Sequence, residues 1–278
     1  MATKKAAVTT KKSTAKPQTI TKVTAVESAK TPVQTVSTVA STKQRLVLAP
    51  TSVGSVIAEF VGTFIFAAGI IASQGSPVIV GFMLVALVLA VNSLSAAHFN
   101  PALSIAAWLT RRISGIRAVA YVVAQVLGAM LALVVLNWFA HANGSEAVTD
   151  PATGQSTGAI QLFAAAAIPE AKEWYVFAAE VLGGFIFGFA VASMIRIKEL
   201  SAKALTMGFG FFTAILIASS AAGVVGATTI LNPAVAVSLQ ALSFNVWPIA
   251  IYIVGPIVGA IIGFTLFDFL KKSEVEKI

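Results

Sequence analysis

The chain contains no cysteine and only two histidines among its 278 residues. The lack of cysteine excludes disulfides, a thiol nucleophile and a thiolate metal site, and two histidines are too few for the usual histidine-based metal sites. We therefore expect neither a metal nor a cofactor. Charged residues are also scarce, at 11% against 57% hydrophobic residues, and the mean hydropathy is +0.88. This composition is typical of a protein that crosses a membrane several times.

The net charge is concentrated at the N-terminus. Residues 1–45 hold eight lysines, Arg45 and a single acid, Glu27, which together account for the whole formal net charge of +8. The remaining residues are balanced and give no sign of nucleic-acid binding. Residues 1–50 show no lasting helical or strand period, so we expect a disordered basic cytoplasmic tail beside an anionic membrane face, with a targeting role as the alternative.

Six apolar segments are long enough to cross the hydrocarbon core of a bilayer. They cover residues 53–72, 77–97, 116–140, 174–195, 203–222 and 246–270. Two shorter apolar segments, 101–110 and 233–243, each begin with Asn-Pro-Ala. Asparagine is a good helix N-cap and proline suits the first helical position, so both triplets predict helix starts.

The loop charges predict the orientation. When the six segments alternate across the membrane, one side receives the tail and most of the other cations, namely Arg111, Arg112, Arg117, Arg196, Lys198, Lys203, Lys271 and Lys272. Since cytoplasmic loops carry an excess of lysine and arginine, we expect a multi-pass protein of the cell membrane with both termini in the cytoplasm.

The two halves of the chain repeat each other. Ala58-Glu59-Phe60-Val61-Gly62 resembles Ala179-Glu180-Val181-Leu182-Gly183. We expect a membrane domain over residues 51–271, with one repeat at about 51–140, a second at about 174–270, and a short cytoplasmic C-terminus at 272–278. Three segments per half require the copies to insert in opposite directions, which places a site at the membrane midplane.

These features resemble the aquaporin, or major intrinsic protein, family. The resemblance rests on the segment from Ser95 to Ala102, on Ala58–Thr63, on Tyr121–Ala129 and on Val254–Ala260. It implies an all-α membrane protein with six transmembrane helices and two re-entrant half-helices in an inverted repeat. It also implies a homotetramer in the lipid bilayer, with one pore per subunit for water or small neutral solutes, and no enzymatic activity. The pore residues would be Asn100, Pro101, Ala102, Asn232, Pro233 and Ala234.

The two Asn-Pro-Ala triplets also have a physical rationale as pore elements. Two half-helices that meet at their N-termini direct positive dipole ends to the midplane, where a cation is disfavoured. The asparagine amides can cap their helices with the oxygen and still donate to a passing water.

Glu59 and Glu180 are acids well inside the apolar segments. They are either proton-coupling groups of a transporter or acceptors for the irregular backbone beside each half-helix, and their symmetric placement favours the second role. His98 and Gln125 are interpreted in the same way, as groups that pack against or support the loops.

The expected outer constriction departs from the family. An arginine usually follows the second Asn-Pro-Ala, whereas this chain has Val235 there, and the other three constriction positions fall on Thr229, Val80 and Ser220. Valine supplies neither charge nor a donor fork, so the sequence predicts a wider, less polar filter. Two rival functions remain open: a proton-coupled secondary transporter on a similar inverted repeat, and a non-conducting structural membrane protein.

Overall fold

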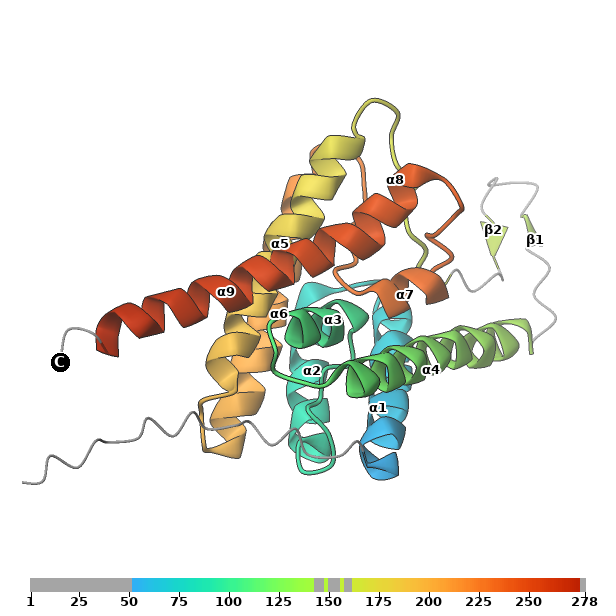
Figure 1. The fold of residues 1–278 in the computed structure, drawn as a ribbon. Coiled ribbons are helices and arrows are strands. Elements are labelled where there is room, and N and C mark those ends of the chain that lie inside the picture. The colour runs from blue at the N-terminus through green and yellow to red at the C-terminus, as the bar shows by residue number, and fades with distance from the viewer. Residues whose placement is uncertain (1–51, 143–147, 150–155, 158–161, 276–278) are drawn as a thin grey trace, which may run out of the picture. The chain divides into compact units, whose positions relative to one another are not determined.

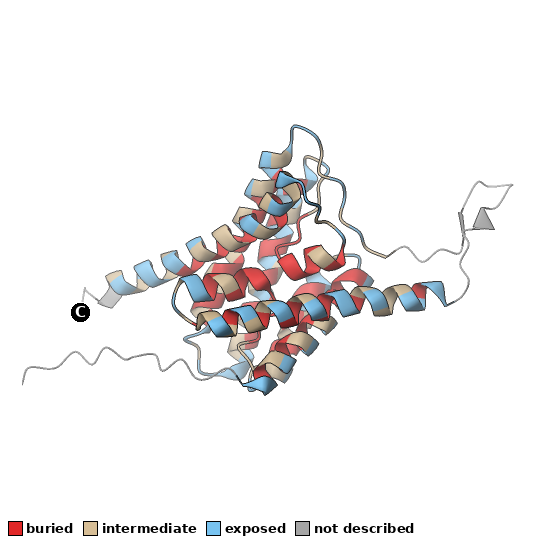
Figure 2. Ribbon diagram, turned by 45° about the vertical axis from the view of Figure 1, so that its right-hand side comes forward, coloured by how far each residue is buried: buried red, intermediate tan, exposed pale blue. Residues whose placement is uncertain are grey.

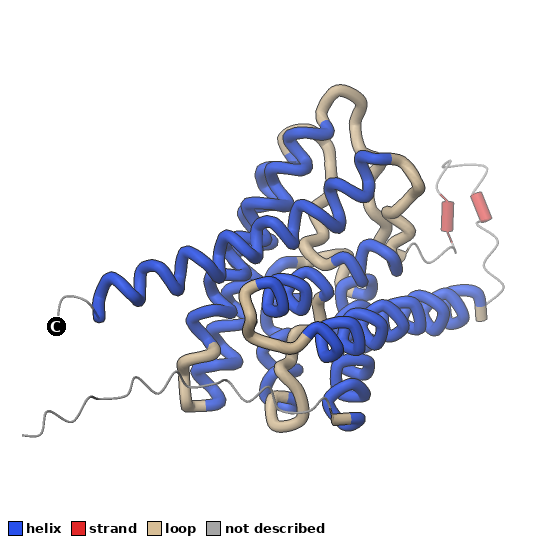
Figure 3. The backbone as a smooth tube through the Cα atoms, viewed as in Figure 1, coloured by secondary structure: helices blue, strands red, loops and turns tan. Residues whose placement is uncertain are grey.

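The computed structural model describes residues 52–142, 148–149, 156–157 and 162–275. The tail expected over residues 1–50 lies outside this part of the chain. The elements, in order, are α1 (Val53–Ala72), α2 (Pro77–Val91), α3 (Pro101–Leu109), α4 (Gly115–His141), β1 (Val148–Thr149), β2 (Ser156–Thr157), α5 (Glu173–Met194), α6 (Leu200–Gly223), α7 (Pro233–Ser238), α8 (Val246–Ile249), η1 (Ala250–Val254) and α9 (Gly255–Val275). Figures 1 and 3 show that the described residues are helical apart from loops and one antiparallel pairing of β1 with β2.

The helices pack as two related sets. In the first half α1 packs along α4, and in the second half α5 packs along α9. The half-helices cross over, since α3 packs against α9 and α7 packs against α4 (Figure 1). Helices α2 and α6 join the halves by packing against each other. This arrangement agrees with the expected all-α inverted repeat.

Glycines allow the close contact within each set. A Cβ atom at Gly128 in α4 would collide with the backbone of Phe60 in α1, and one at Gly259 in α9 would collide with the backbone of Val181 in α5. Small residues at helix crossings let membrane helices approach closely, which is a main source of their packing energy because the surrounding lipid is itself apolar.

The second apolar segment is shorter than predicted. Five helical stretches are long and apolar enough to cross a bilayer in the described ranges, while α2 ends at Val91 after 15 residues, about 22 Å long, instead of continuing to residue 97. Beyond it, the backbone N–H groups of His98 and Phe99 donate to the Glu59 carboxyl group, which binds them in a non-helical turn. A helix through residue 97 would forgo these bonds.

The second half-helix is also shorter than predicted, because α7 ends at Ser238 and not at residue 243. Gln240 adopts a positive φ of 52°, and Ala241 N–H donates to Ala236 O at 3.0 Å. The same closure ends α3, where Arg111 has a φ of 62° and Arg112 N–H donates to Ala107 O. Both ends are Schellman motifs, here formed without the glycine that usually signals them.

The last apolar segment is one continuous helical stretch, Val246–Ser273, with a local π turn at η1. Pro256, the second residue after η1, has no N–H to donate to the carbonyl four residues earlier, which explains why the helical bonding shifts there.

Burial follows the helix contacts. Figure 2 shows buried residues on the sides of the helices that face one another and exposed residues on the outer sides. Many of the exposed side chains are large and apolar, as along α4 at Ile116, Val119, Val123, Val134 and Trp138. Apolar residues on the outer surface of a helical assembly are suited to contact with lipid chains. The chain is therefore a multi-pass membrane protein.

Candidate functional site

Each half-helix begins at an asparagine-capped proline, as the sequence predicts. The Asn100 Oδ1 accepts from Ala102 N–H at 2.8 Å, and the Asn232 Oδ1 accepts from Ala234 N–H at 3.0 Å. Pro101 and Pro233 occupy the first helical position of α3 and α7. The buried N-termini of both half-helices thus have a side-chain acceptor for one of their free N–H groups.

The two asparagines also tie the halves of the chain together. The Asn100 Nδ2 donates to Leu231 O and the Asn232 Nδ2 donates to Phe99 O, both at 2.8 Å. Each primary amide has two N–H donors, so one donor of each is used in this crossed pair and a second is left. Sequence reasoning missed this exchange, since nothing local indicates a partner 131 or 133 residues away.

The intramembrane acids hold the turns before the half-helices. Glu59, fully buried in α1, accepts from His98 N–H at 3.0 Å and from Phe99 N–H at 2.8 Å. Glu180, fully buried in α5, accepts from Ile230 N–H and Leu231 N–H at 2.6 and 2.9 Å. Both carboxyl groups therefore serve as acceptors for irregular buried backbone, which would otherwise lack partners.

The turns that these acids hold are conformationally unusual. Phe99 and Leu231 have positive φ values of 47° and 58°, a region that non-glycine residues rarely occupy. Their side chains pack where Gly62 and Gly183 leave space, because a Cβ atom at either glycine would collide with them. The repeated Glu-x-x-Gly spacing in α1 and α5 thus provides both an acceptor and a gap for each turn.

Among the described residues, a chain of polar side chains extends from Glu59 and not from Glu180. The Gln125 Nε2 donates to Glu59 Oε2 at 2.9 Å and to Ser104 Oγ at 3.0 Å, and Ser104 Oγ lies 3.0 Å from His98 Nδ1. His98 also packs edge-on against Tyr121. The structure therefore places His98 within the turn before α3 and links Gln125 to Glu59, the acid that holds this turn.

A cavity of about 240 Å³ lies on one side of the crossed turns, between α2, α6 and the loop before α7. We refer to it as the apolar cavity. Its walls include three of the four predicted constriction residues, Val80, Thr229 and Val235.

The fourth predicted constriction residue, Ser220, does not line this cavity. It is exposed and donates to Leu216 O, whereas Ser219 lines the apolar cavity with its Oγ 2.9 Å from Thr229 Oγ1. Consecutive helical residues point about 100° apart, so an error of one position in counting along α6 moves the side chain from the cavity to the outer surface. Phe163 and Phe211 also line the cavity, and no sequence signal pointed to them.

A second cavity, of about 660 Å³, contains His98 in its wall and shares no lining residue with the apolar cavity. His98 lies two residues before Asn100, and Ile230 of the apolar cavity lies two residues before Asn232. Each of the two turns before the half-helices therefore contributes a residue to the wall of a different cavity.

Comparisons with known proteins agree with this geometry. A family model described as Major intrinsic protein matches residues 46–267. Aquaporin AqpM of Methanothermobacter marburgensis is 30% identical over 260 residues, covering 78% of this chain and 97% of that protein. The lens fiber major intrinsic protein of Ovis aries is 32% identical over 198 residues, covering 71% and 69%. The solved structure of an aquaglyceroporin from Plasmodium falciparum superposes with a TM-score of 0.58 at 17% identity, covering 81% of this chain and 99% of that one.

Proposed function

The chain belongs to the major intrinsic protein family, and on that premise we propose that it is a passive membrane channel for water and small uncharged solutes. Proteins of this family are channels and not enzymes. The observation that carries the proposal is the crossed pair of asparagine-capped half-helices, whose preceding turns each contribute a residue to a different cavity.

The midplane geometry favours neutral permeants. The helix starts at Pro101 and Pro233 present positive dipole ends, each equivalent to about half a charge, which repel cations. The second amide donor of Asn100 and of Asn232 is left for the oxygen of a passing molecule. A water molecule that accepts from both amides directs its hydrogens away from the midplane, so a continuous proton path is broken there.

The apolar cavity is proposed to set the size limit. Val235 and Val80 are buried in its wall and carry no charge, while Thr229 and Ser219 supply hydroxyl groups. The cavity, of about 240 Å³, has room for several water molecules at ~30 Å³ each. We propose that this filter, without an arginine, admits some neutral solute larger than water.

The membrane setting follows from the charges and the outer surface. We propose that the protein lies in the cell membrane with both termini in the cytoplasm, since Arg111, Arg112 and Arg196 lie in loops of one side. The family resemblance supports a homotetramer with one pore in each subunit. No role in nucleic-acid binding is proposed.

The rival functions predict different flux. A proton-coupled transporter needs an intramembrane acid that exchanges protons, but both Glu59 and Glu180 are occupied by backbone donors. A non-conducting structural protein would show no flux above that of empty liposomes.

Light-scattering permeability on purified proteoliposomes tests the proposal, with water, glycerol and urea measured side by side. We expect flux that is linear in the gradient, has a low activation energy and is indifferent to pH and Na⁺. Saturable uptake that collapses when the proton gradient is dissipated would instead support the transporter.

A further inference from the structure

Five cationic side chains converge on the second cavity, which we call the basic cavity. They come from the α3–α4 loop, from α4, from the α5–α6 loop and from α6, and they are Arg111, Arg112, Arg117, Arg196 and Lys203. Asp268 of α9 is the one acidic residue in its wall within the described part of the chain. The wall therefore carries a formal excess of positive charge.

This convergence needs an explanation beyond membrane orientation. An excess of cations on the cytoplasmic side accounts for their side of the bilayer, but does not require cations from separate segments to line one cavity. These cations would not favour the passage of a neutral permeant either. Like charges around a concave, low-dielectric wall reinforce one another's field and concentrate anions there.

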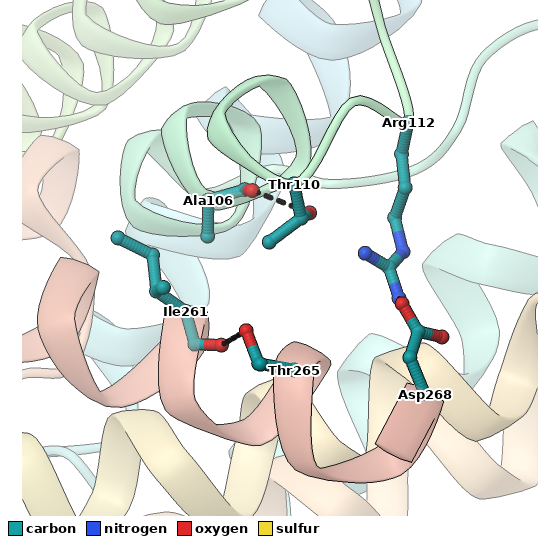
Figure 4. A network of polar contacts seen from close by, with 6 residues as sticks. All are labelled: Ala106, Thr110, Arg112, Ile261, Thr265 and Asp268. Carbon is teal, nitrogen blue, oxygen red and sulfur yellow. Dashed lines mark hydrogen bonds and ion pairs between the residues drawn. The ribbon is translucent and has the colours of Figure 1, made fainter. Parts of the chain in front are cut away.

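Arg112 shows how an anion could be held. Its Nη2 contacts Asp268 Oδ2 at 2.9 Å, and its guanidinium lies 4.5 Å from the centre of the Phe264 ring. Its Nη1 is buried and has no hydrogen-bond partner, and Figure 4 shows the nitrogen beside the one at Asp268 pointing away from that carboxylate. A guanidinium held in place by a carboxylate and a ring, with an unused donor, is well suited to an oxyanion.

We propose that the basic cavity binds a phosphate-class oxyanion, either a soluble phosphate compound or the phosphate of a lipid headgroup. Arg112 and Arg196 supply donors from two different loops, and Lys203 adds a mobile point charge from α6. His98 and Ala96 line the same cavity just before the first Asn-Pro-Ala turn, so a bound anion lies at the mouth of the path and hinders passage through it. Only this last statement rests on the proposed channel function.

Titration calorimetry of the full-length protein in detergent, with inorganic phosphate at constant ionic strength, tests binding. We expect saturable binding that Arg196→Gln and Arg112→Gln each weaken about tenfold, since a hydrogen bond to a charged group is lost. Lys198→Gln is the matched control, because Lys198 lies two residues from Arg196 and does not line the cavity. The exposed Arg196 keeps the test valid if Arg112→Gln fails to fold without its pairing to Asp268.

Absence of saturable phosphate binding would overturn the proposal, as would equal weakening by Lys198→Gln, which would indicate a diffuse surface charge. Nanodiscs separate the two sources of phosphate. Phosphatidic acid added to phosphatidylcholine nanodiscs lowers the apparent phosphate affinity if the lipid headgroup enters the cavity, and leaves it unchanged if the ligand is soluble.

Flux measurements test whether the bound anion lies at the mouth of the proposed path. In phosphatidylcholine proteoliposomes with phosphate on both sides, we expect slower water flux for the native chain and a smaller effect for Arg196→Gln. Phosphate that binds without slowing flux would overturn the placement at the mouth. Phosphate that binds to a protein without any basal flux would refute the channel function and leave the anion site standing.

Discussion

Removing the Glu180 side chain should weaken the fold through the second half-helix turn. Glu180 is fully buried and is the acceptor for Ile230 N–H and Leu231 N–H. In Glu180→Ala both donors lose this acceptor, and each unsatisfied buried group costs about 1–3 kcal/mol, or about 2–6 kcal/mol together. Glu180→Gln keeps one acceptor oxygen and places an amide donor against the other N–H, so we expect about 1–3 kcal/mol, equivalent to roughly 5- to 150-fold in the unfolding equilibrium.

The assay is unfolding by sodium dodecyl sulfate in mixed micelles, followed by circular dichroism, with permeability measured on the same samples. The matched control is Glu170→Ala, an exposed acid in the loop before α5, which should unfold like the native chain. We expect stability to fall in the order native, Glu180→Gln, Glu180→Ala.

Two results would refute this reasoning. If both Glu180 variants unfold like the native chain, the two hydrogen bonds do not stabilise the turn. If native flux depends on a proton gradient, and Glu180→Gln folds and conducts without that dependence, then Glu180 is a coupling group and the transporter is the better interpretation.

Three further predictions test other parts of the chain. Val235→Arg should lower glycerol flux more than water flux, because arginine narrows the apolar cavity, and an unchanged ratio of the two fluxes would contradict the proposed filter. Deleting residues 1–45 should leave folding and unit permeability unchanged while reducing binding to anionic vesicles, and a folded but non-conducting truncation would show that the tail acts on the pore. The side chain of Glu199 accepts hydrogen bonds from Ser201 Oγ, Ala202 N–H and Ser201 N–H, and these bonds lower its pKa. The capping of α6 by Glu199 should therefore be complete above the unfolded-state pKa of about 4.3, and it should be lost as pH falls through the lower folded-state pKa. Hydrogen exchange of the Ser201 and Ala202 amides should show this loss in the native chain and not in Glu199→Gln.

Local sequence signals predicted the helix starts well. Asn100 and Asn232 cap helices at the next residue, and the apolar segments became helices, because both outcomes depend on neighbouring residues and on the demand for internal hydrogen bonds in a membrane. The sequence also identified Glu59 and Glu180 as residues with a role, because carboxyl groups are rare within membrane-spanning segments.

The ends of elements were harder to predict because distant partners decide them. The end of α2 depends on Glu59, about 40 residues from the N–H groups that it binds. The end of α7 depends on Gln240 adopting a positive φ that its residue type does not favour. Ser219 lines the apolar cavity and Ser220 does not, because neighbouring residues of a helix point about 100° apart and the sequence alone does not fix which of the two faces inward.

The comparison of the two halves shows where the symmetry stops. Equivalent positions carry the acid, the glycine, the asparagine and the proline in both halves, so the crossed turns are symmetric. The polar chain is not symmetric. The positions of His98, Ser104 and Gln125 correspond to three apolar residues in the second half, Ile230, Ala236 and Pro256.

This difference lies along the proposed path. His98 lines the basic cavity and Ile230 lines the apolar cavity, so equivalent positions of the symmetric turns face two chemically different cavities. The wall of the basic cavity holds an imidazole and cationic groups, whereas the wall of the apolar cavity holds valine, isoleucine and three hydroxyl-bearing residues. Under the two proposals, we expect selection among neutral solutes to depend on the apolar side and the response to anions to depend on the basic side, so substitutions at Val235 and at Arg196 should act independently of each other.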